Sequence, residues 1–492
     1  MINMDIKKHI KPISIALLTL LLSACAKNPV TGDSDFVLMS EDQEITLGRQ
    51  AHPKIIKRYG RYKDPQLQNY VQEIGSKLAS KSHRNNLIYR FTVLDSDEVN
   101  AFALPGGYIY ITRGLLAYIN SEAEMAAVLG HEIGHVTARH GARQQSTATL
   151  ANILGAVIGA RTGSSVAQNA GNILSRALIS GYGRDHELQA DKLGAEYLAR
   201  SDYDPDAMID VIRVLKNQEL FEKKLAKKEN REPRTYHGVF ATHPDNDKRL
   251  QDVIKAAGNI RSNGINTAHI NRDRFIKHID NLVYGDSEEE GIRRASNFYH
   301  KELGFTLKFP DGWRIKNRPN SVIALAPDNK GLLQLITTDQ NLKIPPRDFL
   351  LKRLNIDALQ QGKEITPAGL RGYSAVAPLE TPYGERDTRI GIVYYNTKAY
   401  ILFAANKSSK QAGLYRQSFF NTLNSFHPLN NEELKLAEPL RLKIITLEPS
   451  STIDSLANQS KIPNYPQEQL RLLNNLYPDG KLEPGKKFKI VE

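Results

Sequence analysis

Two histidines and a glutamate lie within about one helical turn in the segment His131-Glu132-Ile133-Gly134-His135. On a helix, residues four apart share a face, so the imidazoles of His131 and His135 can bind one metal ion. Glu132 is turned by about 100° from His131 and can reach a water molecule held by that ion. Two neutral nitrogen ligands and a carboxylate base are what zinc-dependent peptide hydrolysis needs. The spacing therefore predicts a zinc site with Glu132 as general base.

A single helix is expected to carry this segment. Ser121 and Glu124 have the spacing of a capping box, and apolar residues recur at helical intervals, which predicts a helix from Ser121 to about His140. Gly130 and Gly134 are poor helix formers and leave room on this helix for close packing or for substrate.

A catalytic zinc needs a third protein ligand and an open fourth position. Five downstream side chains are candidates: His140, His186, Glu187, His237 and His243. The metzincin pattern requires glycine at position 138 and histidine at position 141, where this chain has Ala138 and Gly141, so that class is excluded. Glu187 is the better candidate, because Glu187 and Asp191 share one face of a second predicted helix. One carboxylate can bind the metal while the other accepts the remaining ring N–H of a ligating histidine.

Three separately placed motifs, at 100–107, 131–135 and 187–191, together resemble those of the gluzincin metallopeptidases of the BepA, LoiP and HtpX type. The resemblance covers about residues 40–260. It implies one Zn²⁺ per chain, and it assigns the ligands and catalytic groups residue by residue. The implied zinc ligands are His131, His135 and Glu187, the implied base is Glu132, and Asp191 is the implied proton donor or partner of a ligand.

A possible gate follows from the same resemblance. The segment Thr242-His243-Pro244, followed by Arg249, resembles the segment that places a histidine over the zinc in BepA-like proteins. His243 is thus a candidate gate that keeps the enzyme latent. The alternative is a loop histidine before a proline.

Strand-forming runs at 91–94 and 108–112, with the turn signal Pro105-Gly106-Gly107, predict two strands joined by that turn. An edge strand beside the zinc helix lets an extended peptide add as one more strand. A core hairpin is the other interpretation, and both can hold. The expected substrate-binding residues are Asn100, Ala101, Phe102 and Ala103.

The N-terminal segment has the features of a bacterial export signal, with three lysines before an apolar stretch at 13–22 that is too short to span a bilayer. The following Leu22-Ser23-Ala24-Cys25 resembles a lipobox, which predicts cleavage after residue 24 and lipidation of Cys25. Ala26 after the cysteine favours the outer membrane, facing the periplasm. An unpaired thiol in an uncleaved helix is the alternative.

Composition sets the remaining bounds. Of the 492 residues, 40% are hydrophobic and 24% are charged, as in ordinary globular proteins. With one cysteine, no intramolecular disulfide can form, so the fold depends on burial of apolar surface. The net charge of +12 is spread without a dense Lys/Arg run, which argues against a nucleic-acid partner.

The expected fold class is α+β, with a mainly helical zincin-type domain that has a small edge sheet, then an α+β domain and a small terminal module. The expected segments are a signal peptide at 1–24, a metallopeptidase domain at 25–262, a helical connector at 263–300, an α+β domain of unknown role at 301–430 and a LysM-like module at 437–492.

Strand patterns between 304 and 405, interrupted by a helix expected at 346–361, show no 34-residue repeat. BepA-like proteins carry helical repeats here, so the outer-membrane assembly machinery is in doubt as a partner. The end of the chain resembles a degenerate LysM module, which implies peptidoglycan binding. Its usual Gly-Asp is replaced by Ser450-Ser451, and a structural cap is the alternative.

Together these patterns predict a zinc endopeptidase that is lipid-anchored in the periplasm and cleaves misfolded or unfolded envelope proteins. Two rival hypotheses are a zinc-stabilised, chaperone-like scaffold with little proteolysis and a peptidoglycan-binding factor.

Overall fold

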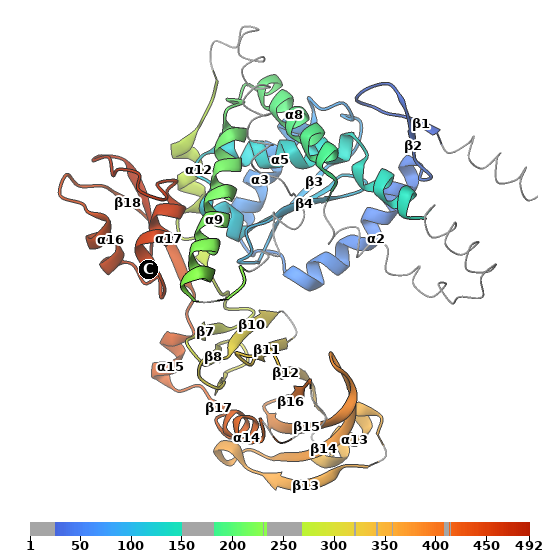
Figure 1. The fold of residues 1–492 in the computed structure, drawn as a ribbon, viewed down its shortest axis with the longest axis vertical. Coiled ribbons are helices and arrows are strands. Elements are labelled where there is room, and N and C mark those ends of the chain that lie inside the picture. Colours follow the sequence, from blue (N-terminus) through green and yellow to red (C-terminus); the bar gives the residue numbers. More distant parts are fainter. Residues whose placement is uncertain are drawn as a thin grey trace, which may run out of the picture. The chain divides into compact units, whose positions relative to one another are not determined.

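The computed structural model describes residues 25–149, 182–229, 231–233, 268–318, 321–340, 343–356, 358–407, 413 and 415–492. The chain divides into two compact units (Figure 1). The first unit combines the chain up to Ile56 with Gly60–Leu282 and Arg441–Glu492, and the second combines Lys57–Tyr59 with Val283–Leu440. The predicted signal segment and His243 lie outside the described residues.

The first unit contains a three-stranded sheet in the order β3, β5, β4. Its strands are β3 (Arg90–Leu94), β4 (Ala101–Leu104) and β5 (Tyr108–Thr112). The turn Pro105-Gly106-Gly107 joins β4 to β5 in antiparallel fashion, and β3 runs parallel to β5. The expectation that this turn joins the strands at 91–94 and 108–112 was therefore wrong. Gly106 and Gly107, with φ of 79° and 86°, reverse the chain at once, whereas a parallel pair needs the longer connection that includes β4.

Helices surround this sheet, and one of them, α5, carries the two histidines. They are α2 (Glu41–Tyr59), α3 (Pro65–Ala79), α4 (Arg113–Tyr118), α5 (Glu122–Thr137), α8 (Arg184–Arg200), α9 (Ala207–Lys228) and α12 (Arg272–Ile279). Every residue of α5 is buried. It contacts α3, α8, α9 and α12 as well as β4 and β5, so it forms the centre of the unit (Figure 1).

The helix predicted from Ser121 is present, and its cap differs slightly from a capping box. The backbone N–H of Glu124 donates to the Ser121 hydroxyl at 3.1 Å, as expected. The Glu124 carboxylate, however, accepts from the backbone N–H of Asn120 at 2.8 Å. The helix ends at Thr137, before the expected His140, because Arg139 adopts a left-handed conformation with φ of 56° that a continuing helix cannot contain.

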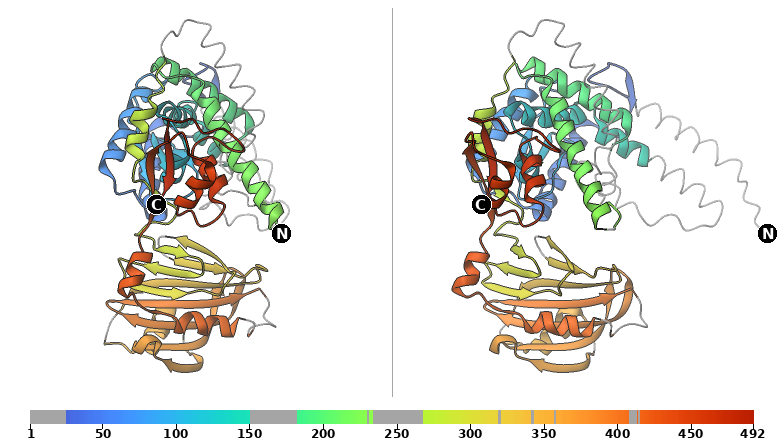
Figure 2. Two further views of the ribbon diagram at one scale, coloured as in Figure 1. Left: turned by 90° about the vertical axis from the view of Figure 1, so that its left-hand side faces the viewer. Right: turned by 60° about the vertical axis from the view of Figure 1, so that its left-hand side comes forward.

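The C-terminal residues of the first unit form a strand, two helices and a strand, in the predicted order. They are β18 (Leu440–Thr446), α16 (Ile453–Gln459), α17 (Pro466–Leu473) and β19 (Lys487–Val491). The two strands pair in antiparallel fashion, with Leu442 opposite Val491. This C-terminal module packs through α17 against α4 and α9. Figure 2 shows the red C-terminal helices beside the green α9.

One buried lysine fastens the C-terminal module to the segment that precedes α5. The side chain of Lys489 is fully buried, and its Nζ donates to the carbonyl oxygens of Ala117 and Ile119 at 2.7 and 2.8 Å. Burial lowers the pKa of Lys489 well below its ordinary value and raises the pKa of Glu124 to about 7, and the opposite charges of the two groups counter both shifts. The module is therefore integral to the first unit.

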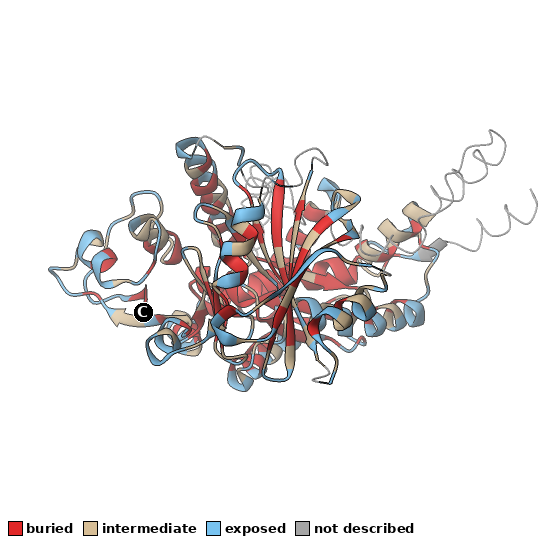
Figure 3. Cartoon of the chain, turned by 90° about the horizontal axis from the view of Figure 1, so that it is seen from below, coloured by how far each residue is buried: buried red, intermediate tan, exposed pale blue. Residues whose placement is uncertain are grey.

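The second unit is built on an antiparallel sheet of seven described strands in the order β10, β11, β12, β16, β15, β14, β13. These are β10 (Arg314–Arg318), β11 (Ser321–Leu325), β12 (Gly331–Asp339), β13 (Gln360–Ile365), β14 (Gly372–Thr381), β15 (Gly384–Tyr395) and β16 (Lys398–Asn406). Its long central strands are largely buried (Figure 3). A smaller sheet consists of β17 (His427–Pro428), β9 (Phe305–Lys308), β8 (Asn297–His300) and β7 (Ile292–Arg294).

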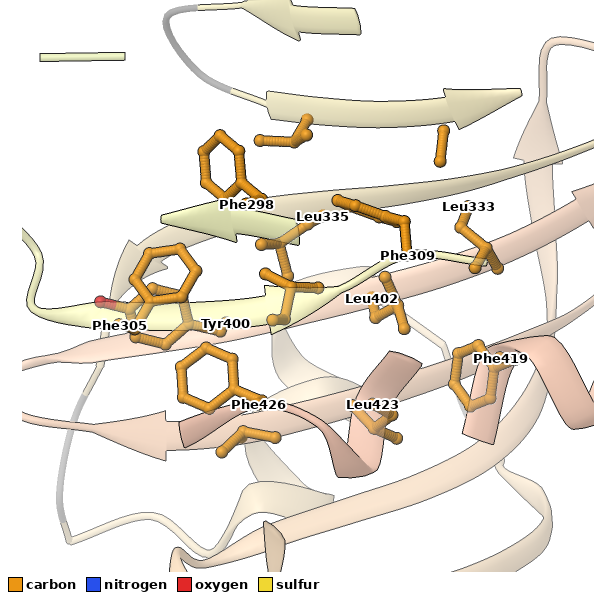
Figure 4. Packing of buried hydrophobic residues seen from close by; sticks show 14 of the residues in the cluster. Phe298, Phe305, Phe309, Leu333, Leu335, Tyr400, Leu402, Phe419, Leu423 and Phe426 are labelled. Atoms are coloured by element: carbon orange, nitrogen blue, oxygen red, sulfur yellow. The ribbon is translucent and has the colours of Figure 1, made fainter. Parts of the chain in front are cut away.

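Alternating side chains of the large sheet build two separate cores. One core joins Tyr400 and Leu402 to β8, β9 and α14 (Arg416–Asn424). In it, Phe305 and Phe426 pack against Tyr400, whereas Phe419 lies nearer to Leu423 (Figure 4). The other core joins residues on the opposite face of the sheet, such as Ile392 and Ile401, to α13 (Pro346–Leu354). The period of two along each strand therefore covers both faces of the sheet with apolar contacts.

The α+β class and the sheet-rich second domain are confirmed, with two local corrections. Within the expected helical connector at 263–300, the described helix is α12, and residues 292–300 contain β7 and β8. Phe298 of β8 enters the core of the second unit. The helix expected at 346–361 ends at Leu354, because Asn355 caps it with φ of 53°, and 360–365 form β13.

Among the described residues, no helix combines the length and the apolar character that crossing a bilayer requires.

Replacing Lys489 tests whether the C-terminal module stabilises the first unit. In Lys489→Met the buried carbonyls of Ala117 and Ile119 lose their donor, so we expect the free energy of unfolding to fall by about 1–3 kcal/mol. Urea denaturation measures this change. Lys487→Met, at an exposed position of the same strand, is the control and should have little effect. Equal stability of both variants and the wild type would contradict the prediction.

Candidate active site

Glycines let the backbones of α5 and α8 approach closely at the site. A Cβ on Gly134 would lie 2.9 Å from the carbonyl oxygen of Ala190, and one on Gly130 would lie 3.3 Å from that of Gly194. From the other helix, a Cβ on Gly194 would lie 3.0 Å from the backbone nitrogen of His131. The room predicted at Gly130 and Gly134 is thus filled by α8. This contact brings Glu187 opposite the two histidines.

The structure brings His131, His135 and Glu187 together in one buried cluster, with their ligand atoms within 4.8 Å of one another. The two Nε2 atoms are 3.0 Å apart. The Glu187 carboxylate oxygens lie 3.6 Å from His131 Nε2 and 3.5 Å from His135 Nε2. Two imidazole nitrogens and a carboxylate directed at one point are the donor set of a catalytic zinc, so the residues fit this ion.

The Nδ1 atom of each imidazole, on the side of the ring away from the cluster, also has a partner. Asp191 Oδ1 lies 2.8 Å from His131 Nδ1. His140 Nδ1 lies 2.9 Å from His135 Nδ1, and His140 Nε2 lies 3.0 Å from Gln189 Oε1. Burial lowers the pKa of His140 to about 3, so its ring is neutral and keeps one nitrogen as an acceptor. Both Nε2 atoms can therefore present lone pairs to a metal.

Glu132 is 2% exposed and lies on α5 between the two histidines. The ring of Tyr182 stacks on His135, with ring centroids 4.0 Å apart. Burial raises the pKa of Tyr182, and the carboxylates of Glu132 and Glu187 raise it further. The Tyr182 hydroxyl therefore lies in the electrostatic reach of both carboxylates.

The other candidate ligands take different places. His140 lies behind His135, and His186 stacks on His140 with ring centroids 4.2 Å apart. His237 and His243 lie outside the described residues. Sequence reasoning missed Tyr182 and Gln189, because neither residue belongs to a spacing pattern with the histidines. His140 was noted in the sequence as a candidate ligand, because it is a histidine five residues after His135. Its spacing did not indicate that it would contact Nδ1 of His135.

The β4 strand borders this site. A small cavity beside His135 is lined by residues that include Ala103, Leu104, Pro105, Gly141 and Tyr182. Helix α2 packs against the β4–β5 turn without space for a side chain at Gly48, where a Cβ would lie 2.2 Å from the carbonyl oxygen of Pro105.

Ion pairs hold helix α2 in place. The buried carboxylate of Glu44 is held by Arg84 at 3.0 Å and by Arg139 at 2.5 Å. Helix α2 and the end of α5 thus hold the turn in place next to the cluster.

A helix-borne pair of histidines with a glutamate from a neighbouring helix is a ligand arrangement found in zinc-dependent metallopeptidases. Residues 65–257 match the model of Peptidase family M48, in agreement with the metallopeptidase motifs of the sequence. The family and the donor set both imply a metal cofactor.

Relatives with known names support this assignment. The chain is 31% identical to the beta-barrel assembly-enhancing protease of Yersinia pestis over 247 residues, covering 47% of this chain and 48% of that protein. Identity to the protease of the same name from Escherichia coli K12 is 30% over 243 residues, covering 47% of each. Identity to the mitochondrial metalloendopeptidase OMA1 of Saccharomyces cerevisiae is 28% over 243 residues, covering 46% of this chain and 68% of that protein. The chain spans about half the length of the beta-barrel assembly-enhancing proteases.

A methyl group at the α5–α8 contact tests whether helix packing assembles the cluster. In Gly134→Ala the new Cβ meets the Ala190 backbone, so we expect the helices to separate, stability to fall by about 1–3 kcal/mol and the zinc content to decrease. Gly183→Ala is the control, because nothing lies within 4 Å of its Cβ. Elemental analysis and thermal denaturation measure the two effects. Wild-type zinc content in Gly134→Ala would show that the contact is not needed.

Proposed function

We propose that this protein is a zinc-dependent endopeptidase with one Zn²⁺ per chain, held by His131, His135 and Glu187. The single observation that carries the proposal is the 3.0 Å separation of the two Nε2 atoms, with the Glu187 carboxylate facing both and Glu132 buried beside them. The M48 match and the metalloendopeptidase relatives support it.

In this proposal each residue has one task. A bound zinc ion would polarise a peptide carbonyl and lower the pKa of a water molecule. Glu132 accepts the proton of that water as it attacks, and then delivers the proton to the leaving amine. Asp191 holds the ring of His131 at Nδ1, which keeps Nε2 available as a ligand.

Replacing the proposed base separates a protease from a zinc-stabilised scaffold. Glu132→Gln keeps all three ligands, so we expect wild-type zinc content with casein cleavage reduced by a factor of at least about 100. Glu196→Gln, on the outer part of α8 in an ion pair with Arg200, is the control and should cleave normally. Full cleavage by Glu132→Gln would remove it as the base. A zinc-loaded wild type that does not cleave casein would favour the scaffold.

We propose that substrates bind as an added strand along β4, through Asn100, Ala101, Phe102 and Ala103. The backbone N–H of Thr112 donates to the carbonyl of Asn100, and bonded pairs alternate along an antiparallel ladder. The peptide groups of Ala101 and Ala103 are then directed away from β5. Because β4 is the edge of its sheet, these groups face the side on which a peptide can pair.

A proline on this edge tests the proposed substrate strand. Ala103→Pro removes one N–H that is directed away from β5, so the sheet should remain while a substrate loses a backbone hydrogen bond. We expect KM for casein-derived peptides to rise about tenfold, which corresponds to one lost bond of about 1.4 kcal/mol, at unchanged zinc content. Ala103→Ser keeps the N–H and is the control. An unchanged KM in Ala103→Pro would refute binding along β4.

We further propose that unfolded or misfolded envelope proteins are the substrates and that Cys25 anchors the protein to the outer membrane in the periplasm. The first part draws on the name of the beta-barrel assembly-enhancing relatives, and the second on the lipobox pattern. His243 remains a candidate gate. For the C-terminal module, the burial of Lys489 against the segment before α5 favours a structural cap over glycan binding.

A further inference from the structure

We propose that His140 is a positioning residue that fixes which ring nitrogen His135 presents to the metal. The inference rests on the proposed zinc site and adds a hydrogen-bonded chain behind it. The chain runs from Gln189 through His140 to His135, with contacts of 3.0 and 2.9 Å. Its two rings are enclosed, because His140 and His135 are 0% and 2% exposed.

The protons in this chain can be placed by elimination. Gln189 Oε1 is an acceptor, so His140 Nε2 carries a hydrogen and donates it. A neutral His140 then has an acceptor at Nδ1, and His135 must donate to it from its own Nδ1. Neutral His135 is left with a lone pair at Nε2, the atom that faces His131 and Glu187.

The reverse orientation of the Gln189 side-chain amide, with its NH2 group facing His140, would prevent His135 from binding a metal. If its amide donated to His140, then His140 would donate to His135 from Nδ1, and the proton of His135 would sit on Nε2. That nitrogen has no lone pair for a metal. The amide orientation of Gln189 therefore sets the tautomer of His135, which it reaches through the ring of His140.

Helix α8 thus supports both histidine ligands and supplies the third ligand. Asp191 holds His131 directly, Gln189 holds His135 through His140, and Glu187 completes the cluster. The ring of His186 lies parallel to that of His140, at an interplanar angle of 15°.

The test measures zinc affinity, by competition with a chromophoric chelator at fixed pH. In His140→Leu the Nδ1 of His135 loses its acceptor, so we expect zinc affinity to fall by about 10–100-fold. In His140→Asn the side-chain oxygen can replace Nδ1, so we expect most of the affinity to return. His186→Leu removes the stacked ring without touching His135, so its affinity should stay within about threefold of the wild type.

A second pair of variants covers the case in which His140→Leu does not fold. Gln189→Leu removes the terminal acceptor and should weaken zinc binding, whereas Gln189→Glu keeps an acceptor and should not. Circular dichroism of the metal-free proteins shows which variants keep the fold.

The outcomes separate this inference from the proposed function. A wild type that binds no zinc would overturn the metal site itself. A wild type that binds zinc, with His140→Leu or Gln189→Leu binding it equally well, would overturn only the role of His140. Equal losses in the leucine and asparagine variants of His140 would do the same, since they would indicate packing without a hydrogen bond.

Discussion

The close approach of α5 and α8 is the constraint on which the rest of the site depends. At Gly130, Gly134 and Gly194 the helices are separated by distances that a side chain would fill. Without this contact the Glu187 carboxylate would not reach the two imidazoles. Because α5 is buried along its whole length, the contact also holds the cluster in a low-dielectric environment, where electrostatic interactions with a metal are strong.

Burying several polar groups in one place is unfavourable unless each has a partner. Here the imidazoles are held from behind, one by a carboxylate and one by a neutral histidine. This difference is chemically useful, because the site gains orientation at His135 without a further negative charge. Glu132, Glu187 and Asp191 already bring three carboxylates close together, and a divalent cation would balance much of their charge.

The first unit is assembled from distant parts of the chain. Lys489, almost at the C-terminus, donates to backbone carbonyls just before α5 and lies within electrostatic reach of Glu124 in the first turn of that helix. The N-terminal end of α5, away from His131 and His135, is thereby tied to the C-terminal module. The second unit has its own two apolar cores and contributes no residue to the cluster described here.

The sequence by itself determined the chemistry of the site and the helices that carry it. The spacing of His131 and His135, the cap at Ser121 and the pairing of Glu187 with Asp191 are local patterns, and local patterns follow from helix geometry. The sequence also predicted several strands of the second unit from their alternation. It did not predict β4, since its alanines have weak strand propensity, nor the strands at 292–300.

Only the tertiary structure decided which distant residues meet. The parallel pairing of β3 with β5, the placement of Gln189 behind His140 and the stacking of Tyr182 on His135 join segments that no spacing rule relates. Such contacts arise from the packing of whole helices and strands, which depends on all the side chains between them. For this reason the proposed metal ligands could be predicted from the sequence, whereas the hydrogen bonds behind them became visible only in three dimensions.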